Sequence, residues 1–580
     1  MRVLLIHPDD SPRRGPWTRE RWDLIVDLGL SSTFSAEEWT RQYSCPVLRA
    51  DSFQEEIQDM RRVRNILAMG RNQLLDPEGI DWWDVTSLLL AFEVHSILSM
   101  QRMAPEIGRS ADLWSTRAGG HARILALLLE RELHAFRAGT VETVTDRIFH
   151  YAGLAHRFSP SEIKQIFLDK YDADYQLRSR FARREPALSK PAVLIPSAYV
   201  NVSRMAAAYA RLLPEQQFLM VATRQSAKQF EAAANIRVRD LAGYADSHPS
   251  AGEIDSLEQR WKKLKTDLCH VPELRILAAL GQLDAVPRWI RDGLFARNAW
   301  REVIEREPVC GVLCGDDSNL YTRLPVLLAA KRNIPTVNFH HGAFDGRYLL
   351  KDFPCDVYLA KTEAERDYLV RVCTLPQERI AIGAPSSSEV VPAGTQEKRT
   401  SVIFFSEPYE VYGMRGEEVY RELLPPLSRV ARESGRDLIV KLHPFESRRQ
   451  RERLIREIMG SANNVNVRVL DGPLTEELVS KAWFGITVES TTVIDCMRHG
   501  VPCFLCGWYT IIPCGYVDQY EKYRIGERLA NTAEIAGIPN RMANAPRPDP
   551  RSALPCQVDP AKLHTWLTVG TRVPADAKPA

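Results

Sequence analysis

The sequence predicts an α/β protein in which two doubly wound, Rossmann-like domains follow an N-terminal, largely helical α/β extension. Three observations lead to this prediction. Short apolar runs rich in β-branched residues alternate with helical patterns, which is typical of parallel strands joined by crossover helices. A polar stretch from Ser386 to Thr400 separates two such series. The chain of 580 residues is also longer than a single hydrophobic core normally supports.

The composition excludes several classes of protein. Lys and Arg (76) exceed Asp and Glu (74) by only two, so the basic excess typical of a nucleic-acid-binding protein is missing. No window reaches about 18 uninterrupted apolar residues, the length of a membrane-spanning helix. The opening MRVLLIHPDD contains too few consecutive apolar residues to be a signal peptide. We therefore expect a soluble protein without a nucleic-acid partner.

The eleven cysteines follow no disulfide-scaffold spacing, so we expect reduced thiols and a cytoplasmic location. Cys496, Cys503, Cys506 and Cys514 form one cluster, which contains a C-x2-C pair. That pair lies within the apolar run VPCFLC, where side chains three residues apart point to opposite faces of a strand. We interpret these cysteines as buried apolar thiols and expect no metal site there.

The N-terminal extension is predicted to span residues 1–185. It opens with the strand-like runs VLLIH and LIVDLG and then becomes mainly helical. The stretch ADLWSTRAGGHARILALLLEREL predicts a strand, a Gly-Gly turn and a helix. The basic run RSRFARREP, residues 178–186, ends in proline and is a candidate linker. We interpret it as a solvated helix end; the alternative is a contact with lipid or nucleic acid.

Two series of strands define the following domains. In residues 186–390 the strands AVLIP, FLMVAT, VCGVLCG, PTVNFHHG, DVYLAK and RIAIGAP alternate with helical patterns. In residues 391–540 the strands are SVIFFSEP, DLIVKLHP, VNVRVL, FGITVES and PCFLCGW. Residues 541–580 are rich in proline and weakly patterned, so we predict a partly disordered tail. Ligands bind doubly wound sheets at the carboxyl ends of the strands, and the unusual residues follow strands here.

The first candidate site is the segment KLHPFES, in which Lys441 and His443 follow the strand DLIV. Pro444 ends the strand, and a helix begins shortly afterwards with its positively polarised amino end. A histidine beside a helix amino terminus is suited to binding phosphate. The alternative is a histidine that only caps its own loop.

The second candidate site is the turn of Glu489, Ser490, Thr491 and Thr492, which follows the strand FGIT. With Ser490 or Thr491 as the N-cap, hydroxyl and backbone N–H groups would face one point, as a nucleotide phosphate requires. Glu489 could accept hydrogen bonds from ribose hydroxyls. The alternative is an ordinary capped helix.

The third candidate site follows two strands of the first domain. His340, His341 and Gly342 come after PTVNF, and Asp316 and Asp317 come after VCGVLC. A neutral imidazole with a pKa near 6.5 is a suitable general base, and a carboxylate is a second choice. Adjacent carboxylates in a loop are more often turn residues, which is the alternative for Asp316.

The order of these motifs resembles that of nucleotide-dependent transferases of surface-polymer synthesis. Over about residues 308–510 the chain is similar to the GT-B superfamily group of capsular-polysaccharide and Kdo-type glycosyltransferases and CDP-glycerol glycerophosphotransferases. The shared features are the HG pair, the strand end IGAP (Gly383 to Pro385), the K-x-HP segment and the Ser/Thr-rich turn. The resemblance implies that His443 and the turn residues Ser490, Thr491 and Thr492 hold the donor phosphates, and that His341 serves the acceptor.

The resemblance therefore implies a GT-B glycosyltransferase that moves a sugar from a nucleotide-sugar donor to a hydroxyl acceptor in surface-polysaccharide or glycoconjugate synthesis. His341 or Asp316 would be the catalytic base. The donor would be bound by Lys441, His443, Glu489, Ser490, Thr491 and Thr492. We expect no cofactor and no obligatory metal. The acceptor would be a glycan or a lipid-linked molecule, and the latter would require peripheral contact with the inner face of the membrane.

Several alternatives stay open. Among the nucleotide bases the resemblance favours cytidine. A CDP-glycerol-type polyol-phosphate transferase would use the same phosphate-binding residues, although its usual Asp-Tyr-Ser-Ser turn differs from Glu489-Ser490-Thr491-Thr492 here. An epimerase of this fold would need paired carboxylates around the sugar, which the sequence does not reveal. From another class, the chain could be a catalytically inactive scaffold that binds nucleotide or glycan.

Overall fold

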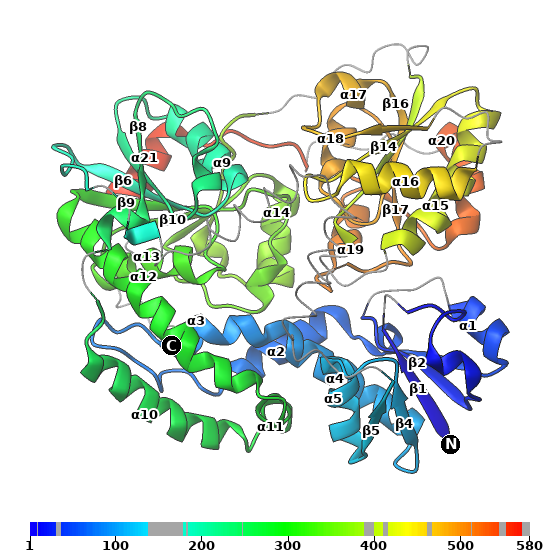
Figure 1. Cartoon of the computed structure of the whole chain (residues 1–580). Helices are drawn as coiled ribbons and strands as arrows, with labels where there is room; N and C mark the ends of the chain where they lie inside the picture. Colours follow the sequence, from blue (N-terminus) through cyan, green and yellow to red (C-terminus); the bar gives the residue numbers. More distant parts are fainter. Residues whose placement is uncertain are drawn as a thin grey trace, which may run out of the picture. The chain divides into compact units, whose positions relative to one another are not determined.

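The structure is a computed structural model that describes residues 1–7, 10–30, 36–136, 178–180, 182, 184–245, 248–387, 399–409, 416–460, 467–511, 513–544 and 553–570. These residues form three parallel β-sheets covered by helices (Figure 1). The chain divides into two compact units. The first unit comprises Met1–Met60, Glu93–Ile163 and Glu389–Arg551, and the second comprises Arg61–Phe92, Lys164–Ser388 and Ser552–Ala580. The α/β fold with Rossmann-like sheets is confirmed.

The N-terminal region contains a complete parallel sheet of five strands in the order β3-β2-β1-β4-β5. Its strands are β1 (Arg2–Ile6), β2 (Leu24–Asp27), β3 (Val47–Arg49), β4 (Asp112–Ser115) and β5 (Leu133–Ala135). Its helices are α1 (Ala36–Tyr43), α2 (Glu56–Ala68), α4 (Ala91–Ile107) and α5 (Gly120–Leu129). The helices make up more of this region than the strands, as predicted, and the structure adds β3 and β5, which have only three residues each and give no sequence signal.

The second unit is built on a sheet of seven parallel strands in the order β12-β11-β10-β9-β6-β7-β8. The strands are β6 (Ala192–Ser197), β7 (Gln217–Ala222), β8 (Ile236–Asp240), β9 (Val309–Cys314), β10 (Thr336–Phe339), β11 (Val357–Ala360) and β12 (Ile380–Ile382). The helices are α9 (Val200–Arg211), α10 (Ala251–Leu268), α11 (Pro272–Ala279), α12 (Val286–Arg306), α13 (Leu320–Lys331) and α14 (Glu363–Asp367). The sequence did not reveal β8, whose segment IRVRD alternates charged with apolar side chains at the edge of the sheet.

Residues 61–92 belong to this second unit and not to a separate N-terminal extension of 1–185. They include α3 (Trp82–Thr86), in which Trp82 and Trp83 are fully buried. The Asp76 carboxylate accepts a hydrogen bond from the Trp82 indole (3.0 Å) and pairs with Arg297 of α12 (2.7 Å). In the basic run of 178–186, Arg178 differs from the predicted solvated segment because it is buried and pairs with Asp240, whereas Arg180 and residues 184–186 are exposed.

The end of the chain returns to the sheet of the second unit, so the predicted tail over 541–580 needs correction for residues 553–570. Helix α21 (Pro560–Thr568), drawn in red in Figure 1, lies against this sheet and buries Leu563 and Leu567 in its core. Before α21, the backbone N–H of Val558 donates to the Ala384 carbonyl (2.9 Å). Gly383 packs against Val558, and its carbonyl accepts from the Tyr209 hydroxyl, which gives the IGAP strand end a packing function.

The sheet of residues 401–529 has six parallel strands in the order β15-β14-β13-β16-β17-β18, which is the doubly wound order. Its strands are β13 (Ser401–Phe405), β14 (Asp437–Lys441), β15 (Val467–Leu470), β16 (Ala482–Thr487), β17 (Cys503–Cys506) and β18 (Glu527–Leu529). Its helices are α15 (Gly416–Glu433), α16 (Arg448–Met459), α17 (Glu476–Ser480), α18 (Thr492–Arg498), α19 (Tyr516–Lys522) and α20 (Ile538–Asn544). Much of the predicted connection from Ser386 to Thr400 lies outside the described residues.

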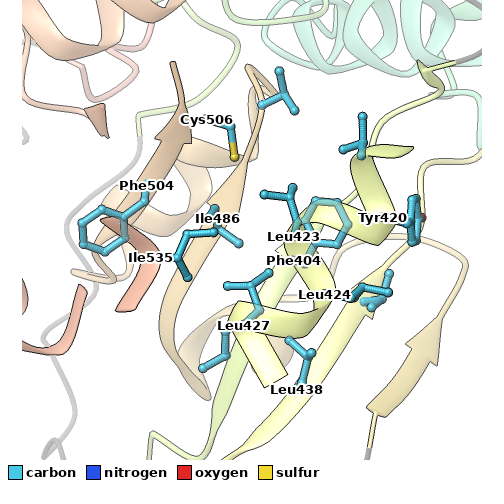
Figure 2. Packing of buried hydrophobic residues seen from close by; sticks show 14 of the residues in the cluster. Phe404, Tyr420, Leu423, Leu424, Leu427, Leu438, Ile486, Phe504, Cys506 and Ile535 are labelled. Carbon is cyan, nitrogen blue, oxygen red and sulfur yellow. The ribbon is translucent and has the colours of Figure 1, made fainter. Parts of the chain in front are cut away.

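Helix α15 supplies the main apolar face that covers this sheet. Its residues Tyr420, Leu423, Leu424 and Leu427 recur at helical spacing and are fully buried. Figure 2 shows these side chains packed with Phe404, Leu438, Ile486 and Phe504 from four neighbouring strands. The core therefore fixes the strands whose ends carry the first two candidate sites.

Ten of the eleven cysteines are at least partly buried. Cys503 and Cys506 lie in β17 as predicted. No helix among the described residues is long and apolar enough to cross a membrane.

Gly311→Ala is expected to destabilise the second unit by roughly 1–3 kcal/mol, as overpacking of a core does. A Cβ atom at Gly311 in β9 would lie 1.8 Å from the backbone carbonyl oxygen of Leu567 in α21, so the helix would have to move. The matched control is Gly252→Ala in α10, where a Cβ atom meets nothing within 4 Å. Thermal unfolding of both variants measures the effect. An unchanged melting temperature for Gly311→Ala would contradict the packing of α21 on β9.

Candidate functional site

The loop that contains His443 is held by a buried carboxylate, that of Glu446. Its Oε1 atom accepts hydrogen bonds from the Ser406 hydroxyl (2.8 Å), the Tyr420 hydroxyl (3.1 Å) and Arg451 Nε (2.9 Å). Its Oε2 atom accepts from the backbone N–H of His443 (2.9 Å). Since Ser406 follows β13, Tyr420 lies in α15 and Arg451 in α16, Glu446 fixes the loop against three elements.

The His443 imidazole is a neutral hydrogen-bond donor in this setting. Burial, with a smaller effect of Lys441, lowers the pKa of His443 to about 4. Its Nδ1 atom accepts a hydrogen bond from the backbone N–H of Phe445 (3.2 Å). The proton of the neutral ring is therefore carried by Nε2, which can donate to an anion. His443 therefore offers an N–H group and no positive charge at pH 7.

Lys441 has a structural role that the sequence did not suggest. The residue is buried, and its ammonium donates to the backbone carbonyls of Leu442 (3.0 Å) and Gly472 (2.7 Å). These bonds tie the end of β14 to the loop after β15. Two of the three ammonium protons are thus already used within the protein.

The turn after β16 is held by Glu407, a residue that the sequence analysis missed. Glu407 follows β13, the central strand between β14 and β16, and its Oε1 atom accepts hydrogen bonds from Thr487 Oγ1 (2.9 Å) and from the backbone N–H of Glu489 (2.9 Å). Burial raises the pKa of Glu407 to about 7, and the nearby Glu446 carboxylate also raises it. Functional residues were sought directly after predicted strands, and the same criterion applies to Glu407, which directly follows the segment SVIFFS.

The four turn residues differ in their surroundings. Glu489 is buried, Ser490 and Thr492 are half-buried, and Thr491 is exposed. Helix α18 begins at Thr492, whose backbone N–H donates to Ser490 Oγ (3.4 Å), while Thr491 makes no capping bond. The hydroxyl of Thr492 is buried and has no hydrogen-bond partner. The helix has only seven residues, so local N–H and hydroxyl groups matter more here than a helix dipole.

The two histidines after β10 lie side by side, with ring centroids 4.8 Å apart. Burial lowers the pKa of both rings, and the Arg347 guanidinium further lowers the pKa of His341. His341 is therefore neutral at pH 7 and can accept a proton, but it is a weaker base than the unperturbed imidazole expected from the sequence. Gly342 is needed because a Cβ atom there would lie 2.9 Å from Cε1 of the His340 ring.

Asp316 has the contacts of a turn residue. Its carboxylate accepts hydrogen bonds from the backbone N–H of Ser318 (2.9 Å) and the amide of Asn319 (3.3 Å), and it pairs with Arg347 (3.3 Å). These contacts match the alternative of a structural carboxylate. The Nδ1 atom of His341 has no hydrogen-bond partner and is buried, so a proton from an acceptor would have to reach the ring at Nε2.

The predicted site residues thus form two groups. Lys441, His443 and the turn 489–492 follow β14 and β16, which flank β13 in one sheet of the first unit. Asp316 and His341 follow β9 and β10, which are neighbours in the sheet of the second unit. Among the described residues, no group of three or more His, Cys, Asp or Glu side chains could hold a metal ion.

No family model and no curated protein matches the chain. Solved structures similar to it include a UDP-GlcNAc 2-epimerase from Neisseria meningitidis bound to UDP-GlcNAc, with 13% identity, a TM-score of 0.39, and coverage of 62% of this chain and 92% of that chain. The calicheamicin glycosyltransferase CalG4 is 14% identical, with a TM-score of 0.37 and coverage of 61% and 90%. MurG of Acinetobacter baumannii is 12% identical, with a TM-score of 0.34 and coverage of 61% and 91%. At such distances these likenesses say nothing about activity.

At pH 8 the variant Glu407→Gln is expected to melt at a higher temperature than the wild type, and at pH 5 the two should melt alike. The folded-state pKa of about 7 lies above the ordinary value of 4.5, so the folded state holds this proton more tightly than the unfolded chain. The resulting stabilisation is complete below about pH 4.5 and is lost as the pH rises through 7. Such a shift corresponds to at most about 3 kcal/mol. Gln resembles the protonated acid at both pH values.

The control for this measurement is Glu215→Gln, at an exposed carboxylate between α9 and β7. Thermal unfolding at both pH values should show no comparable change for it. An equal rise of the Glu407→Gln melting temperature at pH 5 and pH 8 would show that the carboxyl does not titrate in this range.

Proposed function

We propose that the protein is a metal-independent glycosyltransferase of the GT-B type, which transfers a sugar from a nucleotide-sugar donor to a hydroxyl acceptor in surface-polysaccharide or glycoconjugate synthesis. The observation that carries this proposal is the arrangement around β13. The Nε2–H group of His443 and the N–H and hydroxyl groups of the turn 489–492 follow the two strands that flank β13. Buried carboxylates hold both loops in place.

The donor diphosphate would bind between these two loops. His443 would donate a hydrogen bond from Nε2, and the hydroxyls of Ser490 and Thr492 would donate to other phosphate oxygens. Glu489 would accept from the ribose hydroxyls. These donors stabilise the negative charge that develops on the diphosphate when the bond to the sugar breaks. The motif resemblance favours cytidine as the base.

The acceptor hydroxyl would be deprotonated by His341. The acceptor oxygen forms a bond to the anomeric carbon, the bond from that carbon to the diphosphate oxygen breaks, and the acceptor proton moves to the imidazole. A histidine that is neutral before the reaction is in the right state for this step. The acceptor would be a glycan or a lipid-linked molecule. To reach a lipid-linked acceptor, the protein would contact the inner face of the membrane peripherally.

A nucleotide- or glycan-binding scaffold without activity is the second candidate, and one observation favours it. Burial and Arg347 both lower the pKa of His341, and the Asp316 carboxylate is occupied by turn contacts, so both candidate bases are weakened. Binding without turnover would distinguish the scaffold from the enzyme.

His443→Ala is expected to weaken nucleotide binding by about 10- to 100-fold, the effect of losing one hydrogen bond to a charged group. The measurement is a thermal-shift panel with CMP, CDP, UDP, GDP, ADP and NAD on wild type and variant. A ligand at 100 times its dissociation constant stabilises the folded state by about 2.7 kcal/mol, which is readily seen. The control is His564→Ala, at an exposed histidine of α21.

The pH dependence gives an independent check of the His443 state. Because its pKa is about 4, the imidazole is neutral throughout the range from pH 6 to pH 8. The affinity is measured in the Glu407→Gln variant, because Glu407 holds the phosphate-binding turn and has a pKa of about 7. In that variant the affinity for a nucleotide-sugar, whose diphosphate does not titrate in this range, should stay constant. A steady loss of affinity as the pH rises would indicate that a cationic histidine binds the phosphate.

His341→Ala is expected to leave nucleotide binding unchanged and to lower turnover by about 10²- to 10⁴-fold, the usual contribution of a general base. The measurement is kcat with a donor identified in the panel. Asp316→Asn is the comparison, because Asn keeps an acceptor for the Ser318 N–H. Full activity of His341→Ala with a confirmed donor would rule out His341 as the base.

A further inference from the structure

A network of alternating charges lies in the second unit beneath the His340–His341 loop. We call it the interior charge network. Its ion pairs are Asp84–Arg323 (2.7 Å), Arg323–Asp317 (3.7 Å), Asp317–Lys351 (2.5 Å), Lys351–Asp345 (3.8 Å), Asp345–Arg347 (2.9 Å) and Arg347–Asp316 (3.3 Å). The network therefore begins in α3, passes α13, the loop after β9 and the loop after β10, and returns to the loop after β9 at Asp316.

The centre of the network is closed off from water. The side chains of Asp317, Lys351 and Arg323 are each 1% exposed, and that of Asp345 is 5% exposed. A lysine ammonium in such a place keeps its charge only if carboxylates surround it, since desolvation costs several kcal/mol per ion. The Lys351 ammonium meets this condition through Asp317 and Asp345. It also donates to Ser318 Oγ (2.6 Å) and lies 4.1 Å from the centre of the Tyr348 ring.

Lys351 joins the two loops that carry the candidate bases. Asp317 and Ser318 follow β9, next to Asp316, whereas Asp345 follows β10 and lies four residues after His341. The Tyr348 hydroxyl adds a bond from the same loop to Asn338 of β10 (2.6 Å). The loop that carries His341 is thus joined to the loop that carries Asp316 by one buried ammonium, in addition to the direct Arg347–Asp316 pair.

We propose that Lys351 is a positioning residue, whose buried ammonium, bound by Asp317 and Asp345, holds His341 in its desolvated place beside Arg347 and Asp316. The proposal deepens the proposed function, since it concerns the residue assigned there as the base. Lys351 itself, at 1% exposure, does not meet substrate. It acts through the conformation of the 340–351 loop.

A charge count shows how the variants differ. From Asp84 to Asp316 the network holds four carboxylates and three cations, and Arg71 also pairs with Asp84 (3.9 Å). Lys351→Met removes one positive charge, whereas the double variant Asp317→Asn/Lys351→Met removes one charge of each sign and leaves the net charge unchanged. If Lys351→Met fails to fold because of uncompensated charge, the double variant still tests positioning, since it lacks the joining ammonium without adding charge.

The test reads the state of His341 directly and needs no substrate. The imidazole resonance of His341 is assigned by its loss in His341→Ala and titrated by NMR in wild type and variants. In Lys351→Met and in the double variant the pKa of His341 should rise toward the ordinary value of 6.5, because a displaced loop admits water and moves the ring from Arg347. Amide hydrogen exchange of residues 340–351 should speed up. Lys351→Arg, which keeps a cation, should restore most of both properties.

The control is Lys265→Met, which removes a lysine whose partner Asp284 is on the surface of the same unit. It should change neither the His341 titration nor the exchange of the loop. One outcome is that the double variant has a lower melting temperature while its His341 pKa and the amide hydrogen exchange of residues 340–351 equal those of wild type. In that case Lys351 contributes only stability, and the proposal is overturned. Since no turnover is measured, this outcome is separate from the question of whether His341 is the catalytic base.

Discussion

The bond that joins the end of β13 to the turn after β16 is the contact on which the nucleotide-binding proposal depends. The Oε1 atom of Glu407 accepts two hydrogen bonds, one from the hydroxyl of Thr487, the last residue of β16, and one from the backbone N–H of Glu489. Without it, the first residues of the turn would have no fixed position relative to the central strand. Glu446 does the same for the His443 loop on the other side of β13. Two buried carboxylates, adjacent in space, thus hold the two loops at the same edge of one sheet.

Buried carboxylates also hold loops in the second unit, where most of their partners are Lys and Arg side chains. Buried charges contribute little net stability, because desolvation offsets their attraction, but they permit few alternative arrangements. The loop after β10 buries Phe344, Leu349 and Leu350. Apolar packing is not directional, whereas the ion pairs of Asp317, Asp345 and Lys351 specify one geometry. Asp84, from residues 61–92, joins the interior charge network through its ion pair with Arg323. That pair is one of the contacts by which residues 61–92 belong to the second unit.

Sequence reasoning predicted the parallel strands that carry the candidate sites, because each of these strands is a continuous buried run, such as AVLIPS in β6 or SVIFF in β13. It missed the strands at sheet edges, such as β8 and β18, which are short or charged. It also missed the return of the C-terminal segment, since the buried Leu563 and Leu567 give too weak a pattern among prolines. Residues such as His443 and His341 stood out by type and position. Their states could not be predicted, because burial is set by residues distant in sequence.

Burial has one chemical consequence for both histidines of the proposed site. Each imidazole has a lowered pKa and is neutral at pH 7. The phosphate-binding loops therefore offer N–H and hydroxyl donors more than cations, and Lys441 is already bonded to backbone carbonyls. Such a site would bind a diphosphate by directed hydrogen bonds, whose strength increases as charge develops on the leaving oxygen. These bonds would stabilise the transition state, in which negative charge develops on the leaving oxygen, more than the bound donor, which is the difference that catalysis requires.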